Sequence, residues 1–169
     1  MTYTRFLAMI ATSTIVMFGL MYLNTYALDH VYYSQTRTWM AIYIGAVMAI
    51  IMLAFMWTMY RGMTPKLAII GASILIFAGS LFLVRSQTTV GDVSYMRAMI
   101  PHHSIAIMTS ERAHIRDPRV RVLADGIIEA QVREISEMKR LIADLEAQPV
   151  AANAADLPPV PAQSTATGH

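Results

Sequence analysis

Three long apolar stretches constrain this chain more than any other feature. They cover about residues 6–28, 40–60 and 66–84. Each is close to the roughly 20 residues that an α-helix needs to cross about 30 Å of hydrocarbon. Aromatic side chains that favour the membrane–water interface gather near their ends; they are Tyr22, Tyr26, Tyr32, Tyr33, Trp39, Tyr43, Trp57 and Tyr60. The sequence therefore predicts a membrane domain over residues 1–85, with three transmembrane helices in the lipid bilayer.

Charged side chains are scarce and unevenly placed. They make up 14% of the 169 residues, against about 25% in a soluble domain. Before Arg85 a single acid, Asp29, accompanies four bases, which are Arg5, Arg37, Arg61 and Lys66. The sequence pI near 9.0 is thus largely a property of the membrane flanks. We do not interpret it as nucleic-acid binding.

The bases predict an orientation. Arg5 lies near the N-terminus and Arg61 and Lys66 lie in the second connection, whereas the first connection holds only Arg37. The positive-inside rule then puts the N-terminus and the second connection in the cytoplasm. Three crossings of the inner (plasma) membrane would leave everything after residue 85 on the periplasmic or extracellular side. The first stretch could instead be a cleaved signal peptide, but its apolar run is long for one, and cleavage would leave the later residues outside all the same.

The remaining residues predict a linker, a helical hairpin and a tail. Residues 86–91 resemble a linker, and two amphipathic helices are expected at about 92–115 and 118–147, with Asp117 as N-cap and Pro118 at the first helical position. Residues 148–169 are rich in Ala, Pro, Ser and Thr and are expected to be disordered. Two helices cannot enclose a core alone. The hairpin of residues 92–147 should therefore lie on the membrane or form a homodimeric four-helix bundle.

The first hairpin helix carries the densest chemical signal. Met96, Met99 and His103 follow at i, i+3 and i+7, so they share one face, which Asp92, Ser110 and His114 continue. His102 lies beside that face, and Pro101 should kink the helix. Thioether sulfur and imidazole nitrogen are soft, neutral ligands that select Cu(I) or Ag(I). The alternative is that the methionines pack the bundle and the histidines lie near its surface. Cysteine is absent, which excludes thiolate sites.

These motifs resemble a known family. The segments that carry the resemblance are Met99-Ile100-Pro101-His102-His103, Ala106-Ile107-Met108, Leu123-Ala124, Gln131, Glu134-Ile135 and Met138. Together they resemble the family called domain of unknown function 305. The resemblance implies an all-α, ferritin-like bundle that is usually exported, and copper binding in some members. By position it implies the ligands Met99, His102, His103, Met108 and Met138, with Met96 as a neighbour. Many members carry two copies of the motif and this chain carries one, which favours a homo-oligomer.

Two further patterns bear on metal binding. Glu111 and His114 have the Glu-x-x-His spacing of di-iron proteins, but adjacent arginines indicate a solvated face, so they are less favoured ligands and no enzyme is expected. The membrane methionines Met48, Met52, Met56, Met59 and Met63 follow helical spacing on the second stretch. They could relay a soft metal, although packing explains them more simply.

The sequence thus predicts a membrane-anchored, extracytoplasmic protein that binds a copper ion in copper homeostasis or delivery. The alternative is an accessory or structural subunit of a larger complex, which packs against other membrane proteins and has no metal role.

Overall fold

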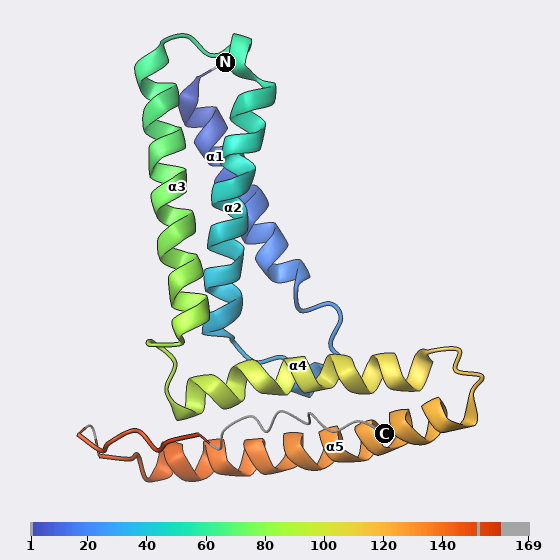
Figure 1. Cartoon of the computed structure of the whole chain (residues 1–169). Coiled ribbons are helices and arrows are strands. Elements are labelled where there is room, and N and C mark those ends of the chain that lie inside the picture. Colours follow the sequence, from blue (N-terminus) through green and yellow to red (C-terminus); the bar gives the residue numbers. More distant parts are fainter. Residues whose placement is uncertain (1, 152, 160–169) are drawn as a thin grey trace, which may run out of the picture.

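A computed structural model describes residues 2–151 and 153–159, and every element in this part of the chain is helical. Three helices form a bundle, and a hairpin of two antiparallel helices lies across one end of it (Figure 1). In chain order the elements are α1 (Tyr3–Leu20), η1 (Leu28–His30), α2 (Gln35–Phe55), η2 (Trp57–Met59), α3 (Met63–Ser86), α4 (Asp92–Arg112) and α5 (Pro118–Ala147). The predicted fold class, three apolar helices followed by a helical hairpin, is confirmed.

Helices α1, α2 and α3 are long and apolar enough to cross a membrane, with mean hydropathies of 1.4, 2.1 and 2.6. A buried hydrophobic cluster lies toward the end that holds the N-terminus, where Phe6 and Leu53 are fully buried. Helices α1 and α2 also approach closely at Gly45, where a Cβ atom would clash with the hydroxyl group of Thr14. These contacts hold the three helices together as one bundle.

The predicted helix limits were partly wrong. The first helix covers residues 3–20 rather than 6–28, because the chain turns after Leu20 and enters a connection. The second begins five residues earlier than predicted, where the Ser34 side chain accepts a 3.2 Å hydrogen bond from the backbone N of Arg37. The third covers residues 63–86 rather than 66–84. Capping groups and turns, rather than hydropathy, set these limits.

The methionine pattern of the second stretch does not persist on one helix. Helix α2 ends at Phe55, so Met56 is its C-cap, Met59 lies in η2 and Met63 begins α3. The apolar run ends at the short 3-10 helix Trp57–Met59, and the chain then turns at Gly62. The φ of Gly62 is 87°, a value that few other residues adopt. A continuous methionine stripe through the bilayer is therefore absent from α2.

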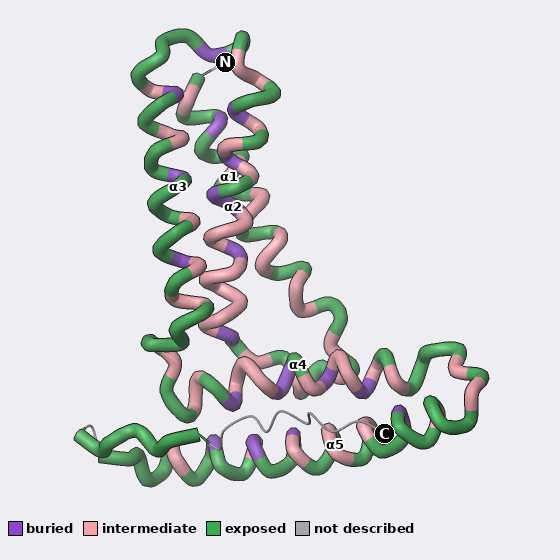
Figure 2. The backbone as a smooth tube through the Cα atoms, viewed as in Figure 1, coloured by how far each residue is buried: buried purple, intermediate pink, exposed green. Residues whose placement is uncertain are grey.

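The second helix of the hairpin begins where the sequence predicts. Asp117 caps α5 by accepting a 2.8 Å hydrogen bond from the backbone N of Arg119, and Pro118 is the first helical residue. The buried residues of α5 face α4 (Figure 2). The core between the helices consists of Met96, Ile100, Ile107, Ile135, Met138 and Ile142. Pro101 is buried within α4, which continues across it. Of the predicted tail, residues 148–151 and 153–159 contain no helix or strand, and residues 152 and 160–169 lie outside the described residues.

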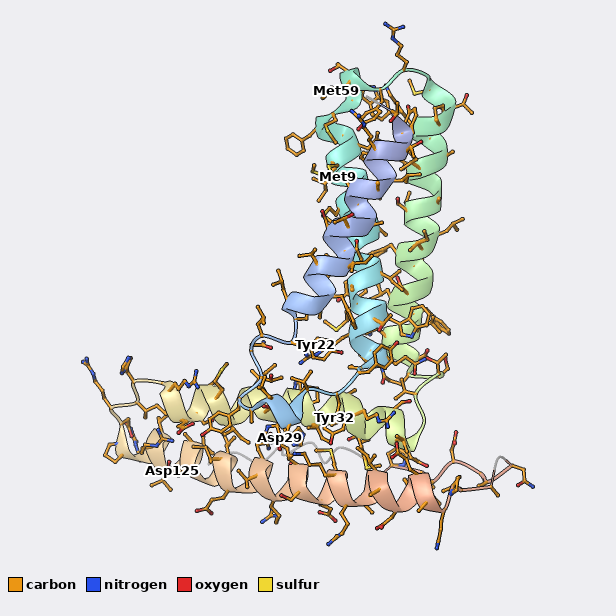
Figure 3. All side chains as sticks on the ribbon, turned by 180° about the vertical axis from the view of Figure 1, so that it is seen from behind. Met9, Tyr22, Asp29, Tyr32, Met59 and Asp125 are labelled. Carbon is orange, nitrogen blue, oxygen red and sulfur yellow. The ribbon has the colours of Figure 1, made fainter. Side chains whose placement is uncertain are left out.

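The connection between α1 and α2 packs on the hairpin. Asp29 and Tyr32 lie beside α4 and α5, whereas Met59 lies at the far end of the bundle (Figure 3). Lys139 Nζ is 2.6 Å from Asp29 Oδ2, and Tyr32 packs against the hairpin core. The sequence predicts that the hairpin needs a second copy or the membrane to cover its apolar face. This connection, from the same chain, covers part of that face.

Candidate metal centre

A cavity of about 780 Å³ runs between α4 and α5; we call it the hairpin cavity. Met96, Met99 and His103 line it from α4, and Met138 lines it from α5. The three residues of α4 share one helix face, as their spacing predicts. The antiparallel packing of α5 brings a third thioether to the same cavity. Four of the six favoured ligand candidates therefore converge on one space.

Packing holds two of these thioethers in place. Met96 is 6% exposed and Met138 is 9% exposed, and both belong to the hairpin core. Met99 is partly buried and packs against the same core. Methionine is flexible when free, so burial limits the positions that these sulfur atoms can take. The methionines that line the cavity lie on helices rather than on a loop.

The charged groups of the hairpin cavity are all carboxylates. Asp92 contributes one from α4, and Glu134, Glu137 and Asp144 contribute three from α5; no lysine or arginine is among the lining residues. A cleft lined by charges of one sign concentrates ions of the opposite sign. The electrostatic potential of this cavity therefore favours cations.

His103 is held in a state suited to binding a cation. Its side chain is 15% exposed, and Nδ1 lies 3.1 Å from Glu134 Oε2. This buried Nδ1 nevertheless makes no hydrogen bond of acceptable geometry. Burial lowers the pKa of His103 below its ordinary value, Glu134 opposes the shift and His102 adds to it. The lowered pKa favours the neutral imidazole, which is the form that ligates metals.

His102 lies on a different cavity. A second space of about 400 Å³, which we call the interface cavity, lies between the hairpin and the end of the three-helix bundle. His102 and Met99 line it from α4, and Met21 and Met40 line it from the bundle. The His102 and His103 ring centroids are 6.2 Å apart. The adjacent histidines thus face two spaces, with Met99 lining both.

The family follows from the sequence match over this region. Residues 92–168 match the family described as Domain of unknown function (DUF305). The hairpin is a DUF305 domain. An uncharacterized protein, L153, of Acanthamoeba polyphaga mimivirus is 34% identical over 101 residues, or 59% of this chain. The chain covers 65% of that relative's length, just under two thirds. No solved structure matches the chain.

The other candidate ligands of the DUF305 hairpin lie elsewhere. Met108 is partly buried but lines neither cavity. Glu111 is exposed and lies at Tyr26, whose pKa it raises through a hydrogen bond and its charge. His114 is exposed and lies beyond the end of α4. Because α4 ends at Arg112, and not near residue 115 as predicted, Glu111 and His114 do not share a helix face. Glu111 and His114 are therefore not arranged as the Glu-x-x-His interpretation requires.

Within residues 2–151 and 153–159, no group of three or more His, Cys, Asp or Glu side chains could hold a metal ion. The donors that the DUF305 hairpin brings together are mainly thioethers. Sequence reasoning missed Glu137 and Asp144 as lining residues, although Glu137 lies three residues after Glu134 and Asp144 lies seven after Glu137, a helical spacing that was a usable signal. It also missed Met21 and Met40, because nothing in the local pattern relates them to α4.

Proposed function

We propose that this protein is a membrane-anchored copper-binding protein that holds Cu(I) in the hairpin cavity outside the cytoplasm, for copper homeostasis or delivery. The convergence of Met96, Met99, His103 and Met138 on one acidic cavity carries the proposal. Helices α1 to α3 support the anchor because each is long and apolar enough to span a bilayer. The copper ion is cargo rather than a catalytic group.

The donor set favours a soft metal. Three thioethers and one imidazole are neutral and polarisable, and such ligands select Cu(I) over zinc and over hard cations such as calcium. The carboxylate of Glu134 lies against Nδ1 of His103. A carboxylate in this position orients a ligating imidazole and leaves Nε2 as the metal-binding nitrogen. The orphaned Nδ1 would gain its hydrogen bond when the ring adjusts to the metal.

The carboxylates that line the hairpin cavity supply the negative charge that the neutral donors lack. A Cu(I) ion that enters a partly buried site loses hydration, and neutral ligands do not offset its charge. The carboxylates of Asp92, Glu134, Glu137 and Asp144 lower that cost without having to be ligands. We expect them to speed capture of the ion as well.

Anaerobic competition with a coloured Cu(I) chelator tests the proposal on the full chain in mild detergent. Replacing His103 with alanine should weaken binding by more than the roughly 10–100-fold that loss of an outer-shell partner costs. Met96→Leu, Met99→Leu and Met138→Leu combined should do the same while nearly conserving volume. His114→Ala is the matched control because His114 is exposed and lines neither cavity.

The alternative role makes the opposite prediction. An accessory subunit with structural methionines should bind no Cu(I) above background, and the variants should change nothing. Stable co-purification of other membrane proteins with wild-type chain, together with unchanged copper affinity in His103→Ala, would favour that role and overturn ours. Circular dichroism of each variant shows whether the helices are retained.

A further inference from the structure

The interface cavity lies between the hairpin and the three-helix bundle. It is lined by the end of α1, the start of α2 and the middle of α4, and its volume is about 400 Å³. Met21 is the C-cap of α1, Met40 lies in the second turn of α2, and Met99 and His102 lie on α4. The consecutive helices α1 and α2 and the distant helix α4 therefore each contribute a thioether to one space.

Methionine is enriched in this cavity beyond its share of the chain. It supplies three of the twelve lining residues, against 14 of 169 in the whole sequence. His102 adds an imidazole, and the polar residues that complete the wall are neutral apart from Arg37. Thioethers with an imidazole form the same soft, neutral donor set that lines the hairpin cavity.

We propose that the interface cavity is a second binding site for a soft monovalent cation, Cu(I) or Ag(I), with Met21, Met40, Met99 and His102 as its donors. This proposal rests on the proposed function, since it extends copper handling from the hairpin to the membrane bundle. Met99 lines both cavities. It is a donor that the two sites share, and an ion can pass between them by exchange at its sulfur atom.

The charged residues that line the two cavities determine which cavity binds a cation first. The lining of the hairpin cavity has four carboxylates and no lysine or arginine, whereas that of the interface cavity has Arg37 and no carboxylate. The guanidinium group of Arg37 donates a 2.7 Å hydrogen bond to the Met21 carbonyl and lies 4.5 Å from the centre of the Tyr22 ring. These contacts hold its positive charge beside the cavity, where it opposes a cation. The interface site is therefore the weaker of the two and fills second.

Methionine methyl NMR separates the two sites in one titration. The full chain is labelled with ¹³C at the methionine ε-methyl groups, held in detergent micelles and titrated with Ag(I), a redox-stable substitute for Cu(I). The first equivalent should shift the methyl signals of Met96 and Met138. The second should shift those of Met21 and Met40. The Met99 signal should move in both steps.

Variants can remove the second site while leaving binding at the first site intact. The double variant Met21→Leu, Met40→Leu should lose the second equivalent and keep the first. The matched control is Met9→Leu, Met59→Leu, because both residues lie in or near the bundle and line neither cavity; it should keep both equivalents. Signals of Met21 and Met40 that stay unmoved through two equivalents would overturn the second site alone. Unmoved signals of Met96 and Met138 would overturn the proposed function instead.

Discussion

The side-chain oxygen of Ser104 accepts a 2.7 Å hydrogen bond from the backbone N of Tyr26, a residue 78 positions earlier in the chain. The same oxygen lies 3.0 Å from Nδ1 of His30. Ser104 is fully buried in the middle of α4, next to the two histidines of the candidate sites. This one hydroxyl therefore fixes the connection between α1 and α2 against the helix that carries the ligand candidates.

Replacing Ser104 with alanine should destabilise the hairpin. The substitution leaves a backbone N–H and an imidazole nitrogen without their partner, and a buried group left unsatisfied in this way costs about 1–3 kcal/mol. Thermal unfolding of the full chain in detergent, followed by circular dichroism, measures the effect. Ser136→Ala is the control, since Ser136 is exposed and donates only to the Val132 carbonyl of its own helix. Equal stability of the two variants would contradict the importance of the Ser104 contact.

Acidification should loosen the same contact through His30. Burial lowers the pKa of His30 below its ordinary value of 6.5, Asp29 opposes the shift, and Lys139 adds to it. The unfolded chain therefore binds a proton to His30 at a higher pH than the folded chain does. Stability rises with pH where the unfolded state binds more protons. The stability is thus intact above pH 6.5 and is lost as the pH falls below that value toward the lowered folded-state pKa.

The test compares melting temperatures at about pH 7.5 and about pH 5.5, on either side of the ordinary histidine pKa. Wild-type chain should lose stability between the two, and His30→Gln should lose less. His103 acts in the same direction, because burial lowers its pKa as well. His30→Gln therefore keeps part of the dependence. A variant with the full wild-type dependence would show that His30 does not report on this contact.

Much of this architecture could be predicted because each element carries its own local signal. The apolar runs predict α1 to α3, and Asp117 with Pro118 predicts the start of α5. The shared face of Met96, Met99 and His103 follows from helical spacing alone. What could not be predicted depends on contacts between distant segments. No local pattern relates Met21 or Met40 to α4, or Asp29 to Lys139, which lies 110 residues later.

The division between His102 and His103 shows the same limit. Adjacent residues on a helix point about 100° apart, so one spacing argument cannot say which space each side chain enters. The packing of α5 on one side and of the three-helix bundle on the other decides it. The sequence therefore predicts the donor types well, whereas tertiary packing distributes them between two cavities.

The hairpin core should depend strongly on Ile100. This side chain is fully buried at the centre of the cluster that joins α4 to α5. Ile100→Ala should cost about 2–5 kcal/mol, because it removes buried apolar surface and leaves a cavity. Leu123→Ala is the matched control, since Leu123 is 64% exposed. Urea titration in detergent measures the difference, and equal midpoints would contradict the core as described.

If α1 to α3 cross a membrane as proposed, their arrangement predicts which segments share a side of it. The hairpin and the first connection lie at one end of the bundle, and the second connection lies at the other (Figure 1). The chain has no cysteine, so single cysteines give a clean readout. Leu28→Cys and Ser136→Cys should react with a membrane-impermeant maleimide on intact cells, and Thr64→Cys only after lysis. Labelling of all three on intact cells, or the reverse pattern, would contradict the proposed orientation.

The last prediction concerns Glu134, whose carboxylate lies 3.1 Å from Nδ1 of His103. Glu134→Gln keeps the size of the side chain and removes its charge. Loss of such an outer-shell carboxylate should weaken Cu(I) binding about 10–100-fold, because the imidazole loses its orienting partner and the cavity loses one negative charge. Glu129→Gln controls for the overall charge, since Glu129 is exposed on the same helix and lines neither cavity. Added salt screens the electrostatic part of the difference in Cu(I) affinity between the two variants, so that part should shrink. The difference in affinity that persists at high salt measures the contribution of Glu134 to the orientation of His103. Identical affinities for the two variants at low salt would show that Glu134 acts on neither the imidazole nor the ion.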